Sequence, residues 1–311
     1  MTEYIQKKIF RDMNLKIYGQ AGLLLMFMLP LLLGTCTTTD EQKLGLLPSA
    51  KGDSGEIILV MDSTKWNGKL GDAVKDVFRD RVPGLPQPEA MFTVRQVEPS
   101  KFQNYLRHHK NVVLVTTFDS KTAGSRYLKQ FFTEQSIQQI KNDTSLYMNN
   151  TRNQFARGQI VMNLFSEDEE TLIRHLNANK HKIQDILNET ERKRLVSRFN
   201  KARKKELEAS IAARHDFGIT LPDGYRLAKD SANFVWLRFP EYDFDKNLII
   251  TYKDYTSEQD FDLENIIEWR NKIAREHTKD PDNPNYYVTT ETLVPVSERK
   301  VSLDGNYAVE A

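Results

Sequence analysis

The histidines, which most often carry acid–base and metal chemistry near neutral pH, are scattered along this 311-residue sequence. No two of them are three or four residues apart, the spacing that directs two ligands from one helix face to the same zinc ion. We interpret each as a surface residue or a locally hydrogen-bonded one, so no zinc centre is predicted. The six are His108, His109, His175, His181, His215 and His277.

Glycine-rich phosphate loops and the Gly-x-Ser-x-Gly turn of serine hydrolases are missing from the sequence. Carboxylates are abundant, for instance Asp62, Asp243 and Asp245, but a catalytic pair is recognised by geometry that a single sequence does not supply. We therefore nominate no catalytic residue, no metal ligand and no cofactor. A binding or scaffolding role is favoured. The alternative is an envelope hydrolase or carbohydrate-active enzyme whose carboxylates come from distant segments.

Cys36 is the one residue whose surroundings predict a chemical modification. Four basic residues precede an apolar run at 21–34, which Pro30 interrupts. The run is shorter than the roughly 20 residues of a bilayer-spanning helix and fits a cleaved export signal better than a permanent anchor. Residues 32–36, Leu-Leu-Gly-Thr-Cys, resemble the lipobox of bacterial lipoproteins, in which the cysteine is acylated and becomes the new N-terminus. The alternative is an ordinary secretory signal with a chance cysteine.

Acylation of Cys36 would make a membrane the first partner of this chain, through an N-terminal lipid anchor. We expect the protein to be exported and anchored to the outer membrane, on its periplasmic or its cell-surface face. The polar stretch Thr37–Gln42 predicts a short tether between the anchor and the folded part. Envelope proteins or glycans are the further partners that this location suggests.

The net charge argues against a nucleic-acid partner. The chain has 44 Lys and Arg against 43 Asp and Glu, and without residues 1–35 the balance is 40 against 41. No global field therefore draws the protein toward nucleic acid. The single cysteine excludes an intramolecular disulfide framework.

Alternating strands and helices are predicted for the first folded part. Short runs rich in β-branched and other apolar residues predict strands at 56–61, 92–97, 111–117 and 159–165. Helical spacing predicts helices at 71–82, at 100–108 with Ser100 as cap, and at 126–142.

A long charged segment, residues 166–215, follows. Its apolar residues recur at helical spacing, which predicts one amphipathic helix or two joined near Asn188, with Ser166 and Glu169 as a capping box. Eight basic residues and no acidic one lie in the run Arg192–Lys205. The run could form a surface for an anionic partner such as lipid phosphate or a solvated outer face, and we favour the second interpretation.

The C-terminal residues predict a second mixed part, with strands at 225–229, 233–239, 247–252 and 286–296 and a helix at 262–277. The predicted fold class is α+β, with two α/β-sandwich-like halves joined by a long charged amphipathic helical segment. The expected regions are a signal peptide with lipobox (1–36), a tether (37–54), a first α+β part (55–165), the helical segment (166–215) and a second α+β part (216–311).

Three prolines within residues 82–89 predict a rigid, extended connector, because proline fixes φ and removes a backbone donor. Such a segment would hold Gln87 and Glu89 at set positions, so we name these two as a possible binding surface. A stiff crossover without a binding role is the favoured alternative.

Several stretches of the sequence together resemble one family, and the proline-rich segment is the most specific of them. They are 46–50, 55–62 with Trp66, 82–89 with Phe92, 109–113, 221–225 and 233–238. The chain resembles an uncharacterised family of Bacteroidetes predicted lipoproteins, the domain of unknown function 4837 (DUF4837), over nearly the whole exported part. The resemblance implies an envelope location and a two-part α+β architecture, and it implies no activity. Family members continue past the point equivalent to Ala311, so it also implies that the second part is truncated here.

Overall fold

The computed structural model describes residues 44–83, 85, 87–242, 245–280, 282–291, 293, 295–303 and 305–311. The chain divides into two compact units, Met1–Pro48 and Ser49–Ala311. Of the first unit, residues 44–48 are described and form one turn. Cys36 and the predicted signal lie outside the described residues. The secondary structure is mixed α+β, as predicted.

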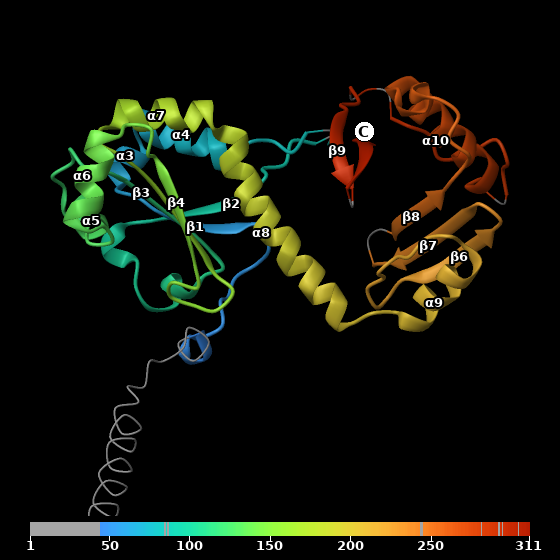
Figure 1. Ribbon diagram of the computed structural model, residues 1–311, viewed down its shortest axis with the longest axis horizontal. Coiled ribbons are helices and arrows are strands. Elements are labelled where there is room, and N and C mark those ends of the chain that lie inside the picture. Colours follow the sequence, from blue (N-terminus) through green and yellow to red (C-terminus); the bar gives the residue numbers. More distant parts are fainter. Residues whose placement is uncertain are drawn as a thin grey trace, which may run out of the picture. The chain divides into compact units, whose positions relative to one another are not determined.

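A five-stranded sheet organises the N-terminal part of the second unit (Figure 1). Its order is β2-β1-β3-β5-β4, with β1, β2, β3 and β5 parallel and β4 antiparallel to β5. The sequence predicted every strand except β4. Its sequence at the sheet edge, Met-Asn-Asn-Thr-Arg, is mostly polar and does not show the apolar pattern of a buried strand. The strands are β1 Glu56–Val60, β2 Thr93–Val97, β3 Asn111–Thr117, β4 Met148–Arg152 and β5 Ile160–Ser166.

Helices cover both faces of this sheet, which explains why its central strands are apolar on both sides. Ile57 and Leu59 of β1 belong to a core shared with α4 (Lys69–Phe78), α7 (Glu169–Ala178) and the first half of α8 (Lys180–Lys201). Ile58 and Val60 point to the opposite core, under the 3-10 turns η1 (Pro99–Lys101) and η2 (Asn104–His108) and helix α5 (Ala123–Lys129).

Several helix boundaries differ from the predicted ones. The helix expected at 71–82 ends at Phe78. The helix expected at 100–108 is instead the two 3-10 turns, and the first of these begins at Pro99 after Glu98, without Ser100 as cap. The helix expected at 126–142 is divided into α5 and α6 (Glu134–Asn142), because the Thr133 side chain accepts a hydrogen bond from the backbone of Ser136 and starts a new helix.

The predicted helical segment consists of three helices rather than one or two. Its breaks lie at Asn179 and at residues 202–204, where α9 (Lys205–Arg214) follows α8, and the expected joint near Asn188 is continuous helix. The predicted capping box is also wrong. Ser166 is the last residue of β5, and Asp168 caps α7 by accepting from the Thr171 backbone at 2.8 Å.

The proline-rich segment is not an extended connector. In this 80–91 loop, the described residues on the two sides are paired by hydrogen bonds from Val82 N to Glu89 O (2.9 Å) and from Met91 N to Asp80 O (2.7 Å). Proline restricts the backbone, but its presence in this segment does not prevent the two ends from pairing. The conformation of the loop therefore depends on cross-loop backbone bonds as well as on proline.

A three-stranded antiparallel sheet forms the first element of the C-terminal part, with β6 Arg226–Ser231, β7 Phe234–Pro240 and β8 Asp245–Thr251 in the order β6-β7-β8. Helix α9 packs on one face of it, where Ile211 meets Val235 and Leu237. Buried His215 at the end of α9 binds Asp230 of β6 (2.8 Å) and the Tyr252 hydroxyl (2.9 Å), so polar contacts fix the helix end as well.

Helix α10 (Leu263–His277) and a hairpin, β9 Arg299–Leu303 and β10 Asn306–Glu310, complete this part. The strand expected at 286–296 is not formed within its described residues. Tyr287 makes one bridge to Lys279, and Thr290 is instead held by the Asn271 side chain of α10 at 2.9 Å, which occupies the backbone donor that a sheet would use.

Gly71 is expected to be required for the junction between α3 (Ser63–Trp66) and α4. A Cβ atom at this position would lie 1.9 Å from the Trp66 carbonyl oxygen, so α4 can begin close to α3 only with glycine. We expect Gly71→Ala to lower the free energy of unfolding by about 1–3 kcal/mol, measured by urea denaturation. The control is Gly218→Ala, where a Cβ has nothing within 4 Å. Equal midpoints for the two variants would contradict this account of the junction.

Candidate functional site

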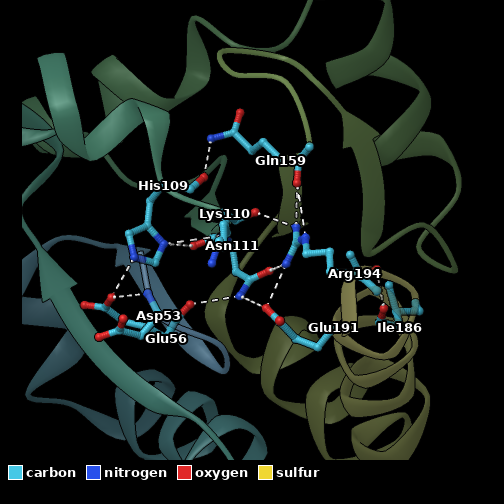
Figure 2. Close-up of polar contacts among 11 residues, drawn as sticks. Asp53, Glu56, His109, Lys110, Asn111, Gln159, Ile186, Glu191 and Arg194 are labelled. Atoms are coloured by element: carbon cyan, nitrogen blue, oxygen red, sulfur yellow. Dashed lines mark hydrogen bonds and ion pairs between the residues drawn. The ribbon is translucent and has the colours of Figure 1, made fainter. Parts of the chain in front are cut away.

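A buried polar network ties helix α8 to the amino ends of β1 and β3 (Figure 2). Asn111, the first residue of β3, is 1% exposed. Its side-chain nitrogen donates to the Glu56 carbonyl (2.9 Å) and to Oε1 of Glu191 (2.7 Å), and its Oδ1 accepts from Arg194 (2.7 Å). One amide therefore connects two strands and a helix with every hydrogen bond satisfied, which is what burial of a polar group requires.

Arg194 supplies most of the bonds from the helix side. Its guanidinium donates to the carbonyls of Lys110 and Gly158, both at 2.9 Å, and pairs with Glu191 at 2.7 Å. Burial lowers the pKa of Arg194, and the neighbouring Glu191 carboxylate opposes that shift. The planar fork of arginine suits this position because it reaches several acceptors at once.

His109 completes the network on the β1 side. Its Nε2 lies 2.8 Å from Glu56, and this hydrogen bond is the main cause that holds the pKa of the Glu56 carboxyl below its ordinary value. Gly52 has φ +108°, and a Cβ atom there would lie 2.0 Å from the His109 ring. Only glycine can therefore occupy position 52, where the backbone lies against this ring. The histidine is thus locally bonded and has a structural role.

A basic groove of about 530 Å³ lies beside this network, between the second half of α8 and the turn from β4 to β5. We define the basic groove by its six cations. They are Arg152, Arg157, Lys193, Arg194, Arg198 and Lys201. Its other lining side chains are neutral, and no carboxylate is among the described residues that line it.

Most of the groove cations are not neutralised by the protein. Arg194 is paired with Glu191, and Lys193 lies 3.3 Å from Glu189. The other four have no ion pair with any described residue, although Arg157 donates to the Ser49 hydroxyl at 3.1 Å. They are Arg152, Arg157, Arg198 and Lys201.

Like charges that converge without counter-charges repel one another, so this arrangement stabilises the fold less than a mixed surface would. It does fit an anion. Arginine presents paired donors that match the oxygens of phosphate or carboxylate, and concave walls concentrate the positive field. The chemistry available to the groove is therefore binding and orienting an anionic group.

The carboxyl ends of β1 and β3 are the other place where a ligand is expected, because the strand order reverses direction between them. The charged groups there are already occupied. Lys65, whose side chain is 10% exposed, donates to Thr117 (2.6 Å) and pairs with Glu169 (2.9 Å). Lys129, whose pKa is lowered by burial, donates to two backbone carbonyls of the loop after β3. Internal contacts thus use the donors that a ligand at this edge would need.

The residues singled out in the sequence do not meet at one site. Cys36 and Asp243 lie outside the described residues. Gln87 and Glu89 are exposed on the 80–91 loop and do not line the basic groove, so their binding role stays a prediction. Asp245 is paired with Arg238. Among the described residues, no three His, Asp or Glu side chains are placed to hold a metal ion.

Sequence reasoning found the α8 half of the basic groove and missed the half from β4 and its turn. Arg152 ends the strand that was not predicted, and Arg157 precedes Gly158, which has φ +84° in the turn. The sequence contained one sign of this second half: Arg152 and Arg157 flank turn residues immediately before the buried strand predicted at 159–165.

Family models match both parts of the chain. Residues 204–311 match the domain of unknown function DUF4837, which confirms the resemblance for this part. Residues 50–200 match a different model, the domain of unknown function DUF8532, and this range includes the stretches 55–62, 82–89 and 109–113 that suggested DUF4837. The two matches meet at the break between α8 and α9. No curated protein matches the chain, and no solved structure does.

Arg194 and Arg198 are one helical turn apart and are expected to differ in what they contribute. Arg194→Gln leaves Glu191 and two carbonyls without their donor, so we expect the free energy of unfolding to fall by about 2 kcal/mol. Arg198→Gln removes an exposed cation with no ion pair to a described residue and should change it by less than about 0.5 kcal/mol. Urea denaturation measures both, and similar losses would contradict the division of roles.

Proposed function

We propose that this chain, which carries a DUF8532 domain ahead of a DUF4837 domain, is a lipid-anchored protein of the cell envelope that works by binding an anionic ligand in the basic groove. The ligand class is a phosphate- or carboxylate-bearing group. The role is binding or scaffolding and needs no cofactor.

The lining of the basic groove is the observation that carries this proposal. Four cations from two separate elements face one concavity without a protein counter-ion among the described residues. The polar network around Asn111 and Arg194 joins the two walls, so the backbone positions of the cations are fixed before an anion binds and only their side chains must be ordered. The favoured sequence interpretation, a solvated outer face, did not include the arginines of β4 and its turn.

The envelope location is supported by the sequence around Cys36. A basic start, an apolar run interrupted by proline and a lipobox-like end are the features of an export signal followed by acylation. No helix in the described part of the chain is long and apolar enough to cross a bilayer. We propose anchoring to the outer membrane, with the membrane as first partner and envelope proteins or glycans as further ones.

The basic groove does not fit the alternative of a hydrolase. Glycoside hydrolysis needs two carboxylates facing one cavity, about 5–9.5 Å apart. The described residues that line the basic groove include no carboxylate, and its cations would hold an anion rather than polarise a glycosidic bond.

We expect the chain to bind inorganic pyrophosphate in calorimetric titration. Arg152→Gln combined with Arg198→Gln should weaken binding at least about tenfold, because each arginine can supply charge-assisted hydrogen bonds to phosphate oxygens. The matched control is Lys101→Gln combined with Lys121→Gln, which removes two exposed cations of the same domain outside the groove and should leave the affinity unchanged. If the groove variant binds as tightly as the wild type, the groove is not the anion site.

We expect Cys36 to be acylated in cells. Metabolic labelling with a palmitate analogue should label the wild type and leave Cys36→Ala unlabelled, since this is the only cysteine of the chain. Thr37→Ala, next to the acylation position, is the matched control and should retain the label. Equal labelling of wild type and Cys36→Ala would overturn the lipid anchor.

A further inference from the structure

We propose that the anion bound by the basic groove is the phosphate of membrane lipid headgroups, so that the protein docks on the bilayer through this groove. This inference rests on the proposed function and names the ligand class of the same site. Three observations favour a bilayer over a free phosphate: where the chain enters the fold, the length of the tether, and an exposed aliphatic side chain beside the groove.

The chain enters the folded unit at the rim of the basic groove. Ser49, the first residue of the second unit, forms a parallel bridge with Arg157, and the Ala50 backbone donates to the Arg157 carbonyl at 2.9 Å. The Arg157 guanidinium in turn donates to the Ser49 hydroxyl. A groove cation therefore holds the first residue of the second unit.

The chain between the anchor and the domain has a limited reach. About a dozen residues separate Cys36 from Ser49, so their fully extended length is at most roughly 45 Å. A domain of the size of residues 50–200 has a radius of gyration of about 15 Å, so its far side lies about as far from Ser49 as the chain can reach at full extension. An anchor at Cys36 would therefore keep the face around Ser49, which includes the basic groove, close to the headgroups.

An exposed aliphatic side chain lies next to the basic groove. Val196 of α8 is 51% exposed and lines a neighbouring hollow together with Lys193, Ser197 and Lys201, which also line the groove. Protein surfaces that bind anionic bilayers combine exposed apolar side chains with Lys and Arg. Free phosphate would use the cations and would give no role to this aliphatic residue.

With the lipid anchor in place, weak contacts with headgroups are sufficient for the groove to dock on the bilayer. A tethered groove samples a small volume next to the bilayer, so its effective concentration at the lipid phosphates is high without any further contact. Acyl chain and basic groove together provide the two signals that stable membrane attachment uses. Two points of attachment also fix the orientation of the domain, which a single flexible anchor does not.

Vesicle flotation of the full chain tests this inference. Phosphatidylcholine vesicles are compared with vesicles of equal parts phosphatidylcholine and phosphatidylglycerol. The test variant is Arg152→Glu combined with Arg198→Glu, and the control is Lys101→Glu combined with Lys121→Glu, the same charge change outside the groove. All chains share the apolar segment 21–34, so its affinity for both kinds of vesicle cancels in the comparison. Unchanged urea midpoints verify that the variants are folded.

The expected result is that the wild type and the control prefer anionic vesicles and that the test variant loses this preference by at least about twentyfold. Each basic residue near an anionic surface contributes about a fivefold gain in binding. Equal preference in all three chains would overturn the inference. Pyrophosphate binding in the groove without preference for anionic vesicles would overturn the membrane ligand alone and leave the anion site intact. Failure of both assays would overturn the proposed function as well.

Discussion

The hydrogen bonds that join Asn111, Glu191 and Arg194 are the interaction on which the arrangement of the N-terminal part, residues 50–200, depends. Apolar packing holds the first half of α8, where Ile183 and Leu187 are buried, but beyond Leu187 the helix contributes no residue to the buried apolar core. From there the hydrogen bonds of the Arg194 guanidinium fix the position of the helix against the sheet. Because the groups are buried, removing one partner would leave others without a hydrogen bond. The network therefore stabilises this position of α8 and also disfavours other positions, in which these groups would be unsatisfied. The backbone that carries the cations of the second half of α8 keeps a fixed position for this reason.

The location of the basic groove differs from the rule for open α/β sheets, in which ligands bind at the carboxyl ends of the strands. Here the side chains at that edge bind one another: Lys65 lies between Thr117 and Glu169, and Lys129 is bonded to backbone carbonyls. At the amino edge, Arg152 and Arg198 have no ion pair with any described residue. A ligand can bind only where polar groups are not already hydrogen-bonded within the protein. The strand order alone therefore does not determine the position of the site.

Much of the fold could be predicted from the sequence because buried parallel strands are continuous apolar runs, and β1, β3 and β5 are of this kind. Strand β4 is exposed and polar at the sheet edge, so no local pattern marks it. The break at Asn179 was missed because apolar residues continue at helical spacing across it. The Asn179 side chain ends α7 by donating to the His175 carbonyl at 2.9 Å. The candidate site was half predictable: the basic run was visible, but its partners Arg152 and Arg157 follow from the pairing of β4 with β5, which joins residues distant in the sequence from α8.

The near-zero net charge explains why such a groove would orient the protein on an anionic surface as well as attract it to that surface. With 40 basic against 41 acidic residues after residue 35, the exported chain would have almost no net charge, so the concentration of cations in one groove must be balanced by acidic residues elsewhere. A uniformly basic protein would approach an anionic surface in many orientations. A neutral chain with segregated charge is attracted on one face and repelled on others, and screening beyond about 8 Å at physiological salt makes this difference act only near contact. The tether at Ser49 would keep the domain within reach of that contact, so local charge and chain connectivity together would select a single docked face.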